Sequence, residues 1–222
     1  YKVRNFLLEK VVFQSSDQFK DILGLSSGGN IFINFVNRYF DNYIKLKEEL
    51  KDKQFSMDII GPDFGLGSNA LHYFDLFKYF GAGEVKLDKF QLTENTAGNK
   101  RGSQYKEILG QISISSDCGS RLNISSDPLR TGGVEIILKS GNVTHYINEA
   151  LASHIEFGAY NITTSPLHVE YTSVLTGKIY QDMLDSKCLL PALNDTMDIH
   201  GLLFKSINSS LNIGINNICP IT

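Results

Sequence analysis

The order of hydrophobic patterns in residues 30–92 constrains the fold more than any other feature of this chain. Apolar side chains recur at helical spacing in 32–50, and a second, nearly all-apolar helix is expected over 68–80. Two short strand-like runs, 55–60 and 84–92, alternate with these helices. A helix–strand–helix–strand order with short loops favours parallel pairing, so this region is expected to form part of an α/β layer or barrel.

The pattern changes in the second half of the chain. From Ile108 onward, turn-rich segments separate short alternating runs such as ILGQISIS, VEIILKS, HVEYTSVL and LNIGINNI. Runs of this kind are typical of an antiparallel β-sandwich. We therefore predict two regions, a partial TIM-barrel-like α/β region at 1–100 and a C-terminal β-sandwich at 101–222.

The composition is that of a globular protein, with 42% hydrophobic residues in a chain of 222. No apolar run approaches the roughly 18 residues that a membrane span needs. The net charge of -3 gives no general basic surface that would attract nucleic acid. We therefore expect no membrane span and no nucleic-acid partner.

Sequons and cysteines suggest the compartment. The N-terminus, YKVRNFLLEK, has neither an initiator Met nor a signal-peptide pattern, so a processed chain is expected. Three cysteines permit one internal disulfide and leave one thiol over. Asn-x-Ser/Thr sequons, more frequent than the composition predicts, occur at Asn123, Asn142, Asn161, Asn194 and Asn208. These marks favour a secreted, extracellular, N-glycosylated protein.

Three kinds of local motif suggest catalysis or cofactor binding, and none fits its context. The loop at 61–70 has glycines between a strand and a helix, but Pro62-Asp63-Phe64 come first, so a structural turn is favoured over a phosphate-binding loop. Gly24-Leu25-Ser26-Ser27-Gly28 matches a nucleophile elbow, yet the segment before it is at least as compatible with a helical turn. The histidines show no metal-ligand spacing. We expect no cofactor and no metal site.

Three short blocks, NIFIN (30–34), IGPDFG (60–65) and GAGEV (81–85), resemble blocks of the heparanase family in the same order and at the same spacing. This resemblance implies a (β/α)₈ barrel followed by a C-terminal β-sandwich, the architecture of a secreted retaining β-glucuronidase. It also implies a disulfide between Cys118 and Cys219, which fall where the family closes its sandwich.

The catalytic residues of that family have no counterpart in this chain. Retaining glycosidases need two neighbouring carboxylates. The family's acid segment corresponds to 24–29, which has no carboxylate, and the nucleophile position is either missing or occupied by Gln111. A basic cluster that serves sulfated glycans in the family is replaced by 65–69. We therefore expect no catalytic residue and no enzyme activity.

The sequence thus predicts a heparanase-like pseudoenzyme with a structural, storage or binding role, in an assembly or with a glycan. An incomplete barrel leaves strand edges and an apolar helix face uncovered, so a homo- or hetero-oligomer is expected. One alternative is a chain of a processed glycoside hydrolase completed by a partner chain, with Asp63 and Glu94 lining the cleft. For these two residues a turn-capping role is favoured. Another alternative is a carrier of an apolar ligand.

Overall fold

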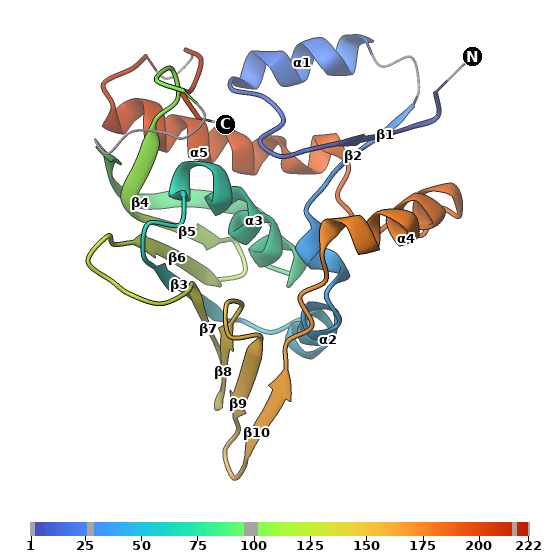
Figure 1. Ribbon diagram of the computed structural model, residues 1–222, viewed down its shortest axis with the longest axis vertical. Coiled ribbons are helices and arrows are strands. Elements are labelled where there is room, and N and C mark those ends of the chain that lie inside the picture. The colour runs from blue at the N-terminus through green and yellow to red at the C-terminus, as the bar shows by residue number, and fades with distance from the viewer. Residues whose placement is uncertain (1–2, 26–28, 96–101, 215–216, 222) are drawn as a thin grey trace.

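A single large sheet forms the centre of the protein (Figure 1). The structure is a computed structural model that describes residues 3–25, 29–95, 102–214 and 217–221. Eight strands lie in the order β10-β9-β8-β7-β3-β6-β5-β4. Their bounds are β3 Ser56–Gly61, β4 Val85–Asn95, β5 Glu107–Ser116, β6 Arg121–Ser126, β7 Glu135–Ser140, β8 Val143–Asn148, β9 Ser153–Phe157 and β10 Ile162–Pro166.

The large sheet is mixed. Strand β3 lies parallel to β6 and antiparallel to β7, and the other neighbouring pairs are antiparallel. Burial alternates along β3, where Met57 and Ile59 are fully buried. This period of two shows that one face of the sheet is covered and the other is more open.

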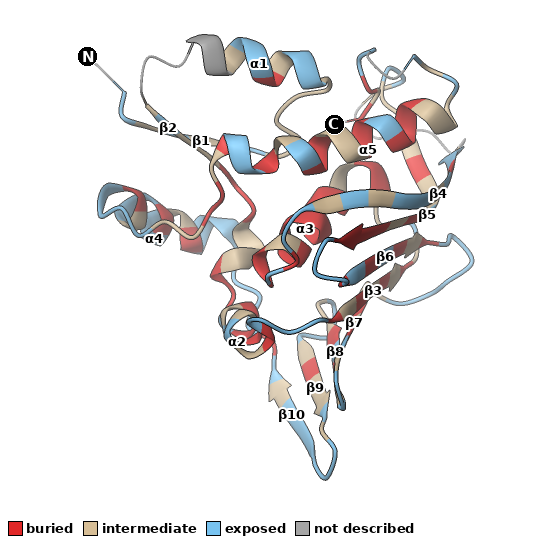
Figure 2. Cartoon of the chain, turned by 180° about the vertical axis from the view of Figure 1, so that it is seen from behind, coloured by how far each residue is buried: buried red, intermediate tan, exposed pale blue. Residues whose placement is uncertain are grey.

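Helices cover the buried face of the sheet (Figure 2). Helix α3 (Leu66–Tyr79) packs against β5, β6 and α5 (Met197–Ser210), and α5 also contacts β4. Helix α2 (Asp41–Leu50) buries Tyr43, Leu46 and Leu50. Helix α4 (Thr172–Leu184) follows the sheet, and two short 3₁₀ helices occupy Val36–Tyr39 (η1) and Leu193–Thr196 (η2).

A second, two-stranded sheet lies beside the helices. Strands β1 (Asn5–Leu8) and β2 (Asn30–Ile33) are parallel, and α1 (Ser16–Leu25) connects them. Parallel neighbours need such a crossover because the chain must return to the same end of the sheet. The carboxyl ends of β1 and β2 therefore lie side by side.

A buried ion pair ties η1 to α3. The guanidinium of Arg38 donates from Nη2 to Asp75 Oδ1 at 2.7 Å and from Nε to Oδ2 at 2.9 Å. Arg38 also donates to the carbonyl of Leu189 at 3.2 Å. Burial raises the pKa of Asp75, and the neighbouring Arg38 opposes that rise. Because both groups are largely buried, removal of one partner would leave the other charge uncompensated.

The prediction of a barrel remnant and a separate sandwich is wrong. Strands β3 and β4, from the first predicted region, belong to the same sheet as β5 to β10 from the second. The predicted strand HVEYTSVL runs into α4, and the described part of LNIGINNI contains no strand. Alternation identified β5 and β7 as half-buried strands, but it cannot tell one sheet covered by helices from two sheets packed face to face.

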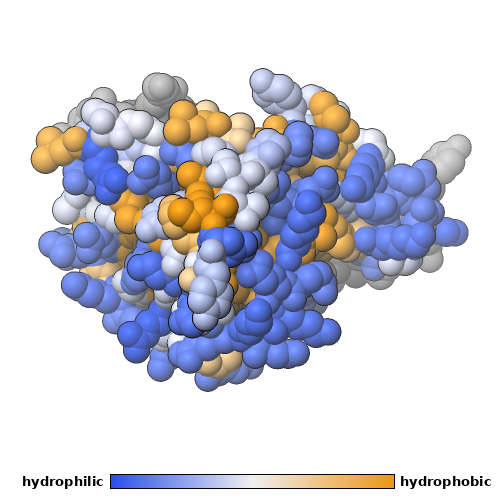
Figure 3. All heavy atoms as spheres, turned by 90° about the horizontal axis from the view of Figure 1, so that it is seen from below, coloured by the Kyte–Doolittle hydropathy of each residue, from blue (hydrophilic) through white to orange (hydrophobic). Residues whose placement is uncertain are grey.

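No membrane-spanning helix occurs within the described ranges. None of the helices there is long and apolar enough to cross a bilayer. The face in Figure 3 is largely hydrophilic, with apolar side chains in small, separate groups. The expected oligomer stays a prediction.

Candidate functional site

Polar residues follow both parallel strands of the small sheet. Glu9 and Lys10 come directly after β1, and Asn34 comes directly after β2. The backbone N–H of Asn34 donates to the carbonyl of Leu8 at 2.8 Å, which joins the two strand ends. Ligands of open α/β sheets bind outside the carboxyl ends of parallel strands. This edge is therefore the first place to look for a site.

The start of α3 faces Lys10. The Lys10 ammonium donates to Asn69 Oδ1 at 2.8 Å and to the carbonyl of Ser68 at 3.2 Å. Gly65, at the N-cap of α3, has a φ of 70°, which favours glycine over residues with a side chain. Asn69 Nδ2 donates to the carbonyl of Phe64 at 2.5 Å, so the amide is fixed from both sides. The turn into α3 thus positions the acceptor for Lys10.

His72 lies one turn further along α3 and is electrically neutral near pH 7. Burial, and then the positive charge of Lys10, lower the pKa of His72 to about 3. Its ring meets Phe35 edge to face, with centroids 5.7 Å apart, and its Nδ1 is buried without a hydrogen-bond partner among the described residues. Beside each other, the fixed ammonium can donate a hydrogen bond to one oxygen of a ligand, and the neutral imidazole can accept a hydrogen bond from another.

Glu9 and Asn34 complete this set. Asn34 is 4% exposed, and its Nδ2 donates to Glu9 Oε1 at 2.7 Å. Its Oδ1 is buried and has no partner within the described ranges. Such an unpaired atom usually requires an explanation, for example a ligand or a water molecule. We name Glu9, Lys10, Asn34, Asn69 and His72 the Lys10 cluster.

Asp63 and Glu94, the predicted cleft residues, make local contacts. Asp63 accepts from the backbone N–H of Gly65 at 3.3 Å and from Asn95 Nδ2 at 2.7 Å. Glu94 pairs with Lys106 at 2.7 Å on a partly exposed surface. These contacts fit the turn and strand-end roles favoured from the sequence.

The 61–70 loop and the Gly24–Gly28 motif lie at a turn and at a helix end, which agrees with the structural interpretations favoured from the sequence. The loop after β3 is a strand-to-helix turn into α3. Helix α1 leads into the Gly24–Gly28 motif and contains its first two residues, where a nucleophile elbow requires a strand before the serine. The other three residues of the motif lie outside the described residues.

The predicted disulfide between Cys118 and Cys219 is not formed. Cys118 lies exposed in the β5–β6 turn and shares a hydrogen bond with Ser116 Oγ at 3.1 Å. Cys219 is a buried free thiol, and its backbone N–H donates to the carbonyl of Gln14 at 2.7 Å. The pairing depended on a sandwich closing around both cysteines, and that sandwich does not exist.

The sequons differ in access. Asn208 is fully buried, and its Nδ2 donates to the carbonyl of Asn217 at 2.9 Å, so this fold leaves no room for a glycan there. The remaining four are exposed, at Asn123, Asn142, Asn161 and Asn194. Asn123 donates to Asp58 at 2.7 Å.

Comparison with known proteins identifies the fold. No family model and no curated protein matches the sequence. A dehydrogenase (MviM) from Clostridium difficile is 15% identical with a TM-score of 0.66, covering 91% of this chain and 70% of that one. An oxidoreductase from Agrobacterium radiobacter, in complex with NAD⁺, L-tartaric acid and magnesium, is 12% identical with a TM-score of 0.65, covering 93% and 70%.

The same fold occurs in a regulator. A super-repressor mutant of Gal80p from Saccharomyces cerevisiae is 11% identical with a TM-score of 0.67, covering 97% of this chain and 73% of that one. The fold is therefore similar to that of these dehydrogenases and oxidoreductases and of Gal80p. Because the identities are low, these similarities establish the fold alone.

These findings correct the heparanase interpretation. The similar structures are dehydrogenases, other oxidoreductases and Gal80p, so a secreted heparanase-like pseudoenzyme, a glycosidase completed by a partner and an apolar carrier are all overturned. The prediction that the chain is not an enzyme is also overturned, in that its fold is enzyme-like. The misleading blocks lie on β2 and at the turns that flank α3, where many strand–helix–strand units need glycine.

The described residues do not by themselves fit a nicotinamide dinucleotide. That cofactor is held by a Gly-rich turn between the first strand and helix of a parallel sheet. The segment between β1 and α1 is Glu9–Ser15, which contains no glycine, and the parallel pairs in the described ranges are β1–β2 and β3–β6.

Proposed function

We propose that this chain binds a small hydroxylated or carbonyl-bearing molecule at the Lys10 cluster, as the substrate-binding part of an oxidoreductase-type protein. One observation carries the proposal: the Lys10 ammonium is fixed by Asn69 beside a neutral His72, next to the carboxyl ends of two parallel strands. Fixed donors and a neutral acceptor suit oxygen atoms of a polyol, a sugar or a hydroxy acid.

Each residue has a distinct part in this binding. The Lys10 ammonium donates to a hydroxyl, carbonyl or carboxylate oxygen, and a charge-assisted bond of this kind is worth about 1.5–3 kcal/mol. The neutral His72 accepts a hydrogen bond from a ligand hydroxyl through an imidazole nitrogen. Asn34, whose Oδ1 is buried and unpaired among the described residues, offers a further acceptor.

The test is calorimetric titration of the chain with a panel of aldoses, polyols and hydroxy acids. We expect at least one member to bind, and Lys10→Met to weaken its binding at least tenfold. Lys20→Met is the matched control, because Lys20 is exposed and pairs only with Asp17 in the described structure. Absence of binding across the panel, or equal loss in both variants, contradicts the proposal.

The similarity to Gal80p gives a second candidate function. A protein described as a transcriptional regulator shares the fold over 97% of this chain. A regulator binds its ligand without turnover, whereas an oxidoreductase changes the absorbance of NAD(P)H when its substrate is added. Measuring that absorbance with the ligand found in the panel separates the two functions.

A further inference from the structure

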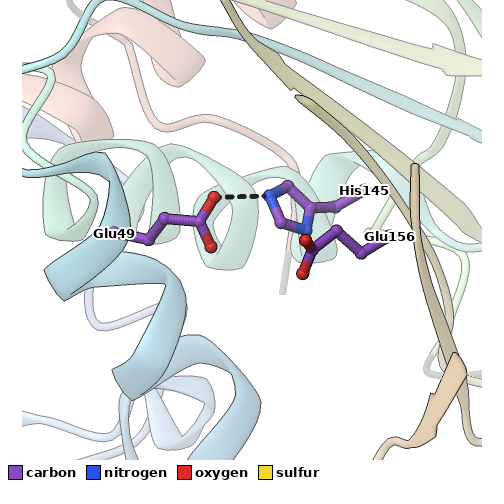
Figure 4. A group of neighbouring side chains, drawn as sticks. All are labelled: Glu49, His145 and Glu156. Atoms are coloured by element: carbon purple, nitrogen blue, oxygen red, sulfur yellow. Dashed lines mark hydrogen bonds and ion pairs between the residues drawn. The ribbon is translucent and has the colours of Figure 1, made fainter. Parts of the chain in front are cut away.

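A second polar cluster lies far from the Lys10 cluster in the sequence and contains residues that bind metals. Glu49 on α2, His145 on β8 and Glu156 on β9 point toward one another (Figure 4). One ligand atom from each lies within 4.8 Å of the other two. Glu49 Oε1 is 3.2 Å from His145 Nε2. We name these three residues the His145 cluster.

Strand pairing fixes two of the three residues. His145 and Glu156 are direct partners across the antiparallel β8–β9 pair, so their side chains emerge on the same face of the sheet. Helix α2 presents Glu49 to that face. His145 is fully buried, whereas 37% of the Glu49 side chain is exposed. His145 is therefore held inside the fold, and the Glu49 side of the site is open to water.

A second histidine orients the first. His154 Nε2 is 3.1 Å from His145 Nδ1, and Asn42 Nδ2 is 3.2 Å from His154 Nδ1. In metal sites, the ring nitrogen that does not bind the metal typically forms such a bond, which fixes the ring. His145 Nε2 is thus directed at the Glu49 carboxylate, with Glu156 beside the ring.

Metal binding requires one rearrangement of this network. His145 binds a metal through an unprotonated Nε2, so its Nδ1–H must donate to His154 Nε2, and His154 Nδ1–H must donate to Asn42. The Asn42 amide can accept that bond after a 180° rotation. The rotation loses only the longer bond from Asn42 to the carbonyl of Pro166, at 3.4 Å.

The charge of the cluster favours a cation. Glu49 and Glu156 bring two carboxylates close together beside His145. Within the described ranges, the only ion-pair partner of Glu49 is His145, and Glu156 has none. Carboxylates this close repel each other unless a cation or proton lies between them. A bound dication would remove that repulsion.

We propose that the His145 cluster binds a divalent transition-metal ion, preferentially Zn²⁺, through Glu49, His145 and Glu156. Zinc sites use imidazole and carboxylate ligands at about 2.0–2.2 Å, which places ligand atoms about 3.3 Å apart in a tetrahedron. The 3.2 Å between His145 and Glu49 already matches this spacing, and the partly exposed Glu49 can close the remainder. Water takes the fourth position on the open side.

The metal would join α2 to the β8–β9 pair. These elements are far apart in the sequence, since 96 positions separate Glu49 from His145. A ligand that binds only the folded state stabilises it in proportion to its concentration over Kd. The site therefore acts as a structural clamp at this end of the sheet.

The test uses the chain after chelator treatment and dialysis, titrated with Zn²⁺ by calorimetry. We expect one zinc per chain at this site, with Glu49→Gln and Glu156→Gln each weakening binding at least tenfold and the double variant abolishing it. Glu48→Gln is the matched control, because Glu48 is an exposed neighbour on the same helix and stands outside the cluster. Circular dichroism checks that all variants fold.

A second measurement separates this site from adventitious binding by the free thiols. Addition of Zn²⁺ should raise the Tm of the wild type and of Glu48→Gln, but not that of the double variant. Zinc binding that persists in the double variant, or no binding by the wild type, overturns the proposal. Loss of binding in Glu48→Gln to the same extent as in the double variant also overturns it.

Discussion

Two histidines in this molecule have opposite electrostatic surroundings. His72, on α3, lies beside the positive charge of Lys10, whereas His145, on β8, lies between the carboxylates of Glu49 and Glu156. Both rings are held by packing and neither belongs to a recognisable sequence motif. The residues around each histidine therefore determine which kind of ligand its site suits. An oxygen-bearing molecule suits the Lys10 cluster, and a cation suits the His145 cluster.

The largest effect on stability should come from the Arg38–Asp75 ion pair, which holds α3, the helix that contains Asn69 and His72. Arg38→Met leaves Asp75 buried and unpaired, which should lower the free energy of unfolding by about 3–5 kcal/mol. Arg130→Met is the control, because its pair with Glu135 is about half exposed and should be worth about 0–1 kcal/mol. Urea denaturation measures both. Equal losses would show that burial of the Arg38 pair does not matter.

The next effect is on the dependence of stability on pH. His72 has a pKa of about 3 in the folded protein and about 6.5 when unfolded, so between these values the unfolded state binds more protons. Its contribution to stability is complete above pH 6.5 and is lost as the pH falls towards 3. The slope for one such group approaches about 1.4 kcal/mol per pH unit.

Replacing His72 should flatten that dependence. In His72→Gln, the loss of unfolding free energy between pH 6.5 and pH 4.5 should be smaller than in the wild type. His168→Gln is the control, because His168 is exposed. Denaturant titrations at several pH values give the slopes. An unchanged slope in His72→Gln would mean that His72 is not held neutral by the fold.

Lys10 should also influence His72 directly. In Lys10→Met, removal of the positive charge should raise the pKa of His72, while burial, the larger cause, still holds it below 6.5. Imidazole NMR signals followed against pH measure this change. Lys20→Met should leave the pKa of His72 where it is in the wild type. A fall in the pKa of His72 in Lys10→Met would contradict the contrast between the two clusters.

The smallest expected effects have opposite signs. Gly65→Ala places a side chain at a φ of 70° before α3 and should cost about 1–2 kcal/mol. Gly177→Ala, in the exposed middle of α4 with open space around it, should stabilise the protein by about 0.5–1 kcal/mol. Thermal denaturation compares them. Stabilisation by Gly65→Ala would show that this turn does not constrain Asn69.

Parts of the fold follow from the sequence because their signals are local. Strand β3 and helix α3 were predicted within two residues at each end, since Gly61-Pro62 separates a short apolar run from a nearly all-apolar helix. Strand β4 was also predicted, but its antiparallel pairing with β5 was not. Pairing depends on which strands meet in space, and the alternation within one strand contains no such information.

The two clusters could not have been predicted from spacing. Lys10 and Asn69 are distant in the chain and meet because α3 starts beside the end of β1, whereas Glu9 and Asn34 meet because β1 and β2 are parallel. His145 and Glu156 become neighbours through the β8–β9 register. The available signal was a pair of strand-like runs, NFLL and NIFI, each followed by polar residues. The resemblance to heparanase uses only the second run, as part of NIFIN, and leaves NFLL unassigned.

One measurement tests the contrast between His72 and His145 most directly. Imidazole ¹⁵N NMR spectra of the chain should be recorded with Zn²⁺ and, separately, with the tightest-binding member of the aldose, polyol and hydroxy-acid panel. We expect zinc to shift the His145 signals and to leave those of His72 unchanged, and we expect the organic ligand to shift the His72 signals and to leave those of His145 unchanged. Zinc acting on His72, the organic ligand acting on His145, or neither histidine responding would contradict it.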